Sequence, residues 1–176
     1  MSETNASQFS IASLFAEREA RRRQEGEAEE QLKRRKEEEL SAFRKRLETF
    51  ELTDAHIQIV QQRIRRAFDR GETELMFASF PSEFCSDGGR AIINAGAPPI
   101  NKPSKEEAER LKNADPEWLA TLPRGARPVY EYWKKAMRPA GFHLSVRIIN
   151  YPEGKPGDVG MFFSWPESAT ESSHHY

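Results

Sequence analysis

Three short stretches in the carboxy-terminal half of the chain carry the hydrophobic pattern of β-strands. Residues 74–80 (ELMFASF) form an apolar run that stops at Pro81, and residues 159–165 (VGMFFSW) form another that also stops at a proline. Residues 142–151 (FHLSVRIINY) alternate between apolar and polar side chains, which is typical of a half-buried strand. A Gly/Pro-rich loop at 152–158 joins the last two stretches, so we expect them to pair antiparallel.

The residues between the first and second of these strands have the start signals of helices. Ser104 followed by Glu107 is a capping box, and Asp115-Pro116 places a cap and an N1 proline before a short helix. Residues 128–137 carry an apolar stripe at helical spacing. This order of elements predicts an α+β fold. We expect a small, antiparallel-containing, three-stranded sheet packed by helices over residues 74–166.

Residues 17–39 are almost entirely charged, with three apolar interruptions. Opposite charges recur one turn apart, as in Glu17 and Arg21, and each such pair stabilises an isolated helix by about 0.2–0.5 kcal/mol. The segment has no apolar stripe to bury. We therefore expect a solvated helix in this region, with Gly26 as its weakest point.

Residues 40–70 differ because apolar side chains recur there at helical spacing. The first part has the a/d spacing of a coiled-coil seam over only about two turns on each side of its centre. Thr53 is a typical N-cap for a second helix, which Gly71 would end. This apolar face needs a covering surface, either the α+β domain or a second copy of the chain, and we expect the cover to be intermolecular. The predicted interaction face consists of Leu40, Phe43, Leu47, Phe50, Ile57, Val60, Ile64 and Phe68.

The pattern thus divides the chain into a disordered tail at 1–12, a helical arm at 13–70, the α+β domain, and a second disordered tail at 167–176. The net charge of −1 argues against a protein that coats nucleic acid or anionic lipid by bulk charge. No run approaches the roughly eighteen apolar residues of a transmembrane helix, and the first residues lack the pattern of a secretory signal. The single cysteine excludes an intrachain disulfide. These features predict a cytoplasmic protein that does not bind membranes.

The segment 84–90 (FCSDGGR) is the stretch most typical of a ligand site. A glycine pair between a strand and a helix could present backbone N–H groups to an anion, with Asp87 and Arg90 nearby. Cys85 could serve as a nucleophile if His143 acted as its base. The alternative that we favour is close packing, because Cys85, Gly88 or Gly89, and Ile92 would form a small-residue groove along one helix. The candidate ligand-binding residues are Cys85, Asp87, Gly88, Gly89, Arg90, His143 and Arg147.

The polar side of the second strand suggests a further interface. Its residues His143, Ser145 and Arg147, with Tyr151 beyond, would share one sheet face beside Phe162 or Trp165 of the neighbouring strand. Aromatic and arginine side chains on an open sheet can stack the bases of single-stranded nucleic acid. The absence of net positive charge makes this the less favoured interpretation. The four histidines have no metal-ligand spacing, so we expect neither a metal nor a cofactor.

Two runs, FPSEFCSDGGRAIINAG and PVYEYWKKAMRPAGFHLSVRIINYPEGKPGDVGMFFSW, resemble a group of small bacterial proteins with no established activity. The likeness covers about residues 75–165. It implies a bacterial cytosolic domain, and it carries no activity or ligand-binding residue over to this chain.

The residues favour a non-enzymatic interaction or regulatory module that associates, with itself or with a protein partner, through its helical arm. Two alternatives remain open at this point. One is single-stranded nucleic-acid binding on the sheet face, and the other is a small-ligand binder or enzyme centred on the 84–90 segment.

Overall fold

The computed structural model describes residues 9–97 and 102–169, and its chain divides into two compact units, residues 1–45 and 46–176. The predicted tails at 1–12 and 167–176 lie largely outside the described residues. Among the helices formed by the described residues, none is both long and apolar enough to cross a membrane.

The first described helix, α2, runs from Ile11 to Glu48 without interruption at Gly26. Ser10 and Ser13 cap its start reciprocally, because each backbone N–H donates to the hydroxyl of the other residue, at 3.2 and 3.1 Å. No α2 residue is buried, and residues 14–39 are exposed throughout. The solvated helix predicted for 17–39 therefore forms part of α2.

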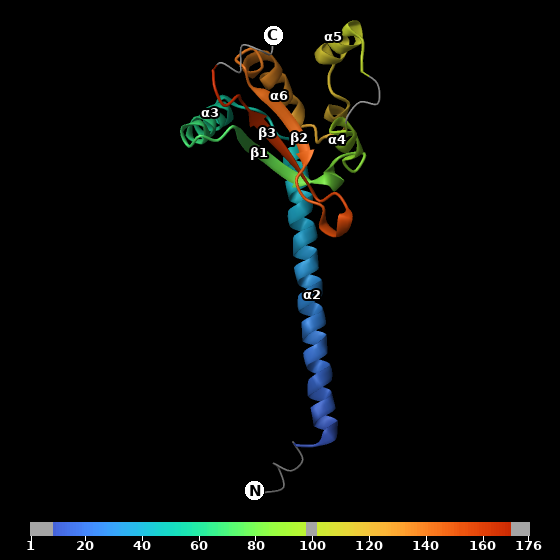
Figure 1. The fold of residues 1–176 in the computed structure, drawn as a ribbon. Helices are drawn as coiled ribbons and strands as arrows, with labels where there is room; N and C mark the ends of the chain where they lie inside the picture. Colours follow the sequence, from blue (N-terminus) through green and yellow to red (C-terminus); the bar gives the residue numbers. More distant parts are fainter. Residues whose placement is uncertain (1–8, 98–101, 170–176) are drawn as a thin grey trace. The chain divides into compact units, whose positions relative to one another are not determined.

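Three antiparallel strands form one sheet, in the order β1-β3-β2 (Figure 1). The strands are β1 (Glu74–Pro81), β2 (His143–Ile148) and β3 (Asp158–Ser164), and β1 carries a bulge at Phe77. The α+β fold and the antiparallel pairing of the last two strands are confirmed. The second strand ends at Ile148 rather than Tyr151. Beyond it, the Asn150 side chain donates to the Asp158 carboxylate and accepts from the Asp158 N–H, and the Asn150 carbonyl accepts from the Gly157 N–H.

The next helix, α3 (Asp54–Asp69), begins and ends where the sequence predicts. Thr53 caps it by accepting a bond from the His56 backbone N–H at 3.3 Å. Gly71, with a φ of +80°, follows the C-cap. Its N–H donates to the Phe68 carbonyl and that of Glu72 donates to the Ala67 carbonyl, which is the Schellman arrangement.

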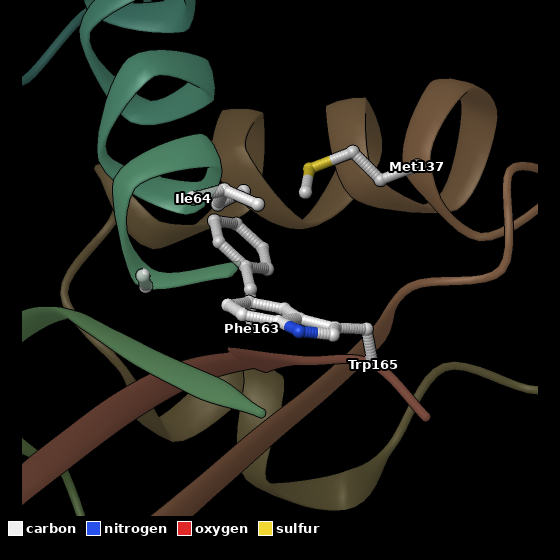
Figure 2. Close-up of a cluster of buried hydrophobic side chains, with 5 residues drawn as sticks. Ile64, Met137, Phe163 and Trp165 are labelled. Atoms are coloured by element: carbon white, nitrogen blue, oxygen red, sulfur yellow. The ribbon is translucent and has the colours of Figure 1, made fainter. Parts of the chain in front are cut away.

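The core explains why α3 belongs to the second unit. Figure 2 shows Ile64 of α3 and Met137 pointing toward the Phe163 ring of β3, beside Trp165. Ile64 and Ala67 are buried in this cluster, so this part of α3 is covered by the chain's own sheet, whereas Phe68 is 62% exposed. The expected intermolecular cover is therefore wrong for Ile64 and stays a prediction for Ile57, Val60 and Phe68. The unit boundary at 45/46 also differs from an arm that extends to residue 70.

The remaining elements complete the second unit around the sheet (Figure 1). On the same side of the sheet as α3, the core is completed by α6 (Ala126–Tyr132), which continues into a π-helical turn, η3 (Trp133–Met137). The predicted helix at 128–137 therefore changes its winding halfway. The other helices and turns are η1 (Ser82–Phe84), α4 (Arg90–Ala95), α5 (Lys105–Asn113), η2 (Glu117–Thr121) and η4 (Pro152–Gly154).

Candidate functional site

Within the 84–90 segment, the Asp87 side chain forms hydrogen bonds with the backbone at the start of α4. The Asp87 carboxylate accepts bonds from the backbone N–H groups of Gly89, at 3.0 Å, and Ala91, at 2.8 Å. A bound anion would need these two backbone N–H groups as hydrogen-bond donors. The Asp87 carboxylate already accepts hydrogen bonds from both. Gly88 and Gly89 both have positive φ, so they form the turn before α4 rather than part of a helical groove. The expectation of one helix running through Cys85, the glycines and Ile92 is therefore corrected.

Gly89 packs closely on the sheet. A methyl group at Gly89 would lie 3.3 Å from the Cδ1 atom of Ile148 in β2. Arg90, by contrast, is exposed. The segment thus acts as a tight connection between η1 and α4, in line with the close-packing interpretation.

Cys85 is placed badly for nucleophilic chemistry. It is 3% exposed, and burial, followed by the nearby Asp87 charge, raises the pKa of its thiol to about 11. A thiolate is the reactive form of cysteine, so the thiol is inert near neutral pH. His143 lies on the opposite face of β2 from Ile148, the residue that Gly89 contacts. The structure therefore does not bring His143 to this segment.

On the face of the sheet that points away from α3, Arg147 covers the Phe162 ring and pairs with Glu74. Ser145 pairs directly with Phe162, so both lie on this face, as predicted. The Arg147 guanidinium carbon lies 3.6 Å from the centroid of the Phe162 ring, and its Nη2 atom lies 2.8 Å from Oε1 of Glu74. The ring is 7% exposed and offers little surface for stacking a base.

Two aromatic residues expected near that face lie elsewhere. Trp165 is buried in the core on the other side of the sheet, where its Nε1 donates to the Glu72 carbonyl at 3.0 Å. Tyr151 follows the end of β2 and is 54% exposed at the start of η4. The sheet face therefore lacks the row of open aromatic rings that single-stranded nucleic-acid readers use.

The predicted interaction face is divided between the two units. Ile64 is buried in the core, whereas Phe68 is 62% exposed. The remaining members are intermediate in exposure: Leu40, Phe43, Leu47, Phe50, Ile57 and Val60.

A second apolar group, at the beginning of α2, was missed in the sequence. Four large side chains there are exposed by 47–79%, and we call them the apolar start: Phe9, Ile11, Leu14 and Phe15. Ile11, Leu14 and Phe15 have the i, i+3, i+4 spacing of one helix face. That spacing could have revealed the segment, but it falls across the boundary of the tail predicted at 1–12.

No protein-family model, curated protein or solved structure matches this chain significantly. The site therefore has to be interpreted from its own geometry.

Proposed function

We propose that this protein is a non-enzymatic interaction module of the cytoplasm, and that the apolar start of α2 is the part that binds another protein chain. The observation that carries the proposal is the exposure of Ile11, Leu14 and Phe15 on one face of a capped helix. A partner groove can take such a face by inserting side chains at i, i+3 and i+4. Burying each of these large apolar side chains contributes about 1.5–3 kcal/mol.

The rest of the helix supports this division of roles. Residues 16–31 are exposed and strongly charged, so the body of the helix has no stripe along which two copies would zip together. The helix is already formed, and a preformed recognition segment loses less conformational entropy when it binds. Arg18 lies over the Phe15 ring, with its Cζ atom 5.6 Å from the ring centroid, and adds a positive charge beside the apolar group.

The test uses the full chain and a matched pair of variants. In Leu14→Asp/Phe15→Asp, charges replace two members of the apolar start. In Leu32→Asp, a charge replaces a 52% exposed leucine further along the same helix. Sedimentation velocity over a concentration series measures self-association, and a photo-crosslinking residue at position 11 reports a different partner in cells.

We expect association or a defined crosslinked adduct with the wild type and the Leu32→Asp variant, and its loss in the double variant. Circular dichroism must show equal helix content in all three proteins. The proposal is overturned if the wild type stays monomeric and gives no adduct, or if the double variant associates as the wild type does.

A further inference from the structure

A groove of about 740 Å³ opens within the second unit, beside the first residues of β2. Its volume lies in the range of roughly 300–1,000 Å³ that is typical of small-molecule sites. Six aromatic or cationic side chains of residues 112–138 line it, together with the 139–144 segment, which adds Phe142 and His143. We call this the π-turn groove, and these six residues are Trp118, Tyr130, Trp133, Lys112, Lys134 and Arg138.

The π-helical turn η3 forms one wall of the groove. The Arg138 N–H donates to the Trp133 carbonyl at 2.7 Å, five residues back, in place of the usual four. Such turns are rare and occur frequently at functional sites, because the extra residue changes which side chains share a face. Here the Trp133 indole N–H donates to the Phe142 carbonyl at 3.0 Å, and the Arg138 guanidinium lies 5.9 Å from the Trp133 ring centroid. The turn therefore holds a flat apolar surface and a positive charge next to each other.

The charge of the groove is positive. The described residues that line it include three cations and neither aspartate nor glutamate. Lys134 is partly neutralised, because its Nζ lies 3.5 Å from the Asp115 carboxylate just outside the lining. Within the described part of the chain, Lys112 and Arg138 form no ion pair, and the Arg138 Nη2 lies 3.5 Å from the Lys112 carbonyl oxygen. Two cations thus remain for an incoming anion.

The aromatic residues form a rigid apolar wall, in which Trp118 and Tyr130 are 9% and 3% exposed and Trp133 is half-buried. Trp118 meets Tyr130 edge-on, with ring centroids 6.2 Å apart, and Tyr130 contacts Trp133 at 5.6 Å. Burial, followed by the nearby Asp115 charge, raises the pKa of Tyr130.

We infer that the π-turn groove binds a small organic anion that combines a flat apolar ring with a carboxylate or phosphate group. The ring would pack against Trp133, the one of the three aromatic residues that is not buried, while the anionic group would pair with Arg138 and Lys112. Both halves of the ligand matter, because the groove offers aromatic surface and unpaired positive charge side by side. This inference concerns the second unit alone and does not depend on the apolar start of α2.

The test is isothermal titration calorimetry on the full chain with three probes. The first probe, 1-naphthyl phosphate, carries both features, 1-naphthol carries only the ring, and inorganic phosphate carries only the charge. We expect the first probe to bind about tenfold or more tightly than either half alone, and the affinity to fall with added salt.

Two groove variants and one control locate the site. Arg138→Gln and Lys112→Gln remove single cations from the groove, and we expect each to weaken binding of 1-naphthyl phosphate, by about tenfold for Arg138. Arg66→Gln removes an exposed cation of α3 outside the groove and should leave the affinity unchanged. Lys112 is exposed on α5, so its variant remains informative if Arg138→Gln fails to fold.

Three results would overturn the inference. They are no binding of 1-naphthyl phosphate, equal binding of 1-naphthol, and equal loss of affinity in the Arg66→Gln control.

Discussion

The backbone N–H of Gly125 donates a 2.8 Å hydrogen bond to the carbonyl of Leu47, in the last turn of α2. A methyl group at Gly125 would collide with that carbonyl oxygen and lie 2.7 Å from Cβ of Phe50. The Glu48 carboxylate accepts a further bond from the Arg124 N–H at 3.2 Å. These contacts fasten residues 46–50 to the start of α6, which is why the chain divides at Lys45 and not at the end of α2.

Gly125→Ala should lower the free energy of unfolding by about 1–3 kcal/mol, because an extra methyl group in a filled space forces the backbone apart. The measurement is chemical denaturation followed by tryptophan fluorescence, since all three tryptophans lie in the second unit. Gly26→Ala is the matched control, because a methyl group there meets nothing within 4 Å. It should leave this transition unchanged and raise the helix content, since alanine favours a helix over glycine by about 0.5–1 kcal/mol. Equal stability of Gly125→Ala and the wild type would contradict the close contact of Gly125 with Leu47 and Phe50.

Phe163 and Phe68 are a matched pair of phenylalanines with opposite burial. Phe163 is 2% exposed and stacks on Phe77 at a centroid distance of 4.0 Å, whereas Phe68 is 62% exposed. Phe163→Ala should cost about 3–5 kcal/mol through lost burial and the cavity that remains. Phe68→Ala should change stability by no more than about 0.5 kcal/mol. Similar losses in both variants, measured by urea denaturation, would contradict the placement of α3 on the sheet.

Arg147 should stabilise the sheet through Phe162 and Glu74 together. Arg147→Ala should cost about 1–2 kcal/mol, the sum of an exposed ion pair and an exposed cation–π contact. Glu74→Gln removes only the ion pair, so it should cost less, about 0.5 kcal/mol, and its cost should shrink at high salt. Thermal unfolding of the two variants at low and high salt provides the comparison. A larger loss for Glu74→Gln than for Arg147→Ala would refute this order.

Cys85 should make stability depend on pH only in the alkaline range. Its thiol has a folded-state pKa of about 11, above the ordinary value of 9.0. Well below pH 9 both folded and unfolded thiols are protonated, so the group has no effect on the pH dependence. Between pH 9 and 11 the unfolded thiol ionises first, and the wild type should lose stability as the pH rises.

The Cys85→Ala variant isolates this effect, because other groups, Tyr130 among them, also titrate at high pH. The difference in unfolding free energy between wild type and variant should be constant up to about pH 8 and then move against the wild type. A constant difference up to pH 11 would contradict the raised pKa. At neutral pH, iodoacetamide should modify Cys85 only after unfolding.

The sequence by itself determined the helices and strands whose ends and faces depend on residues close together in the chain. Thr53 and Gly71 bound α3 because an N-cap hydroxyl and a positive φ act within one turn of the chain. The alternation from Phe142 to Ile148 sorted β2 into an inner and an outer face, since a strand repeats every two residues. The α+β class followed from the order of these elements.

Only the tertiary structure decided which surfaces meet. The apolar stripe of α3 predicts that this face packs against another apolar surface. The pattern is the same whether that surface is Phe163 of this chain or a second copy of the chain. The pairing of β1 with β3 and the contact of Arg147 with Phe162 join residues more than ten positions apart, so no local preference specifies them. The π-helical turn at Trp133–Met137 was not predicted either, because the apolar stripe at 128–137 specifies a helical face and not a π-helical winding.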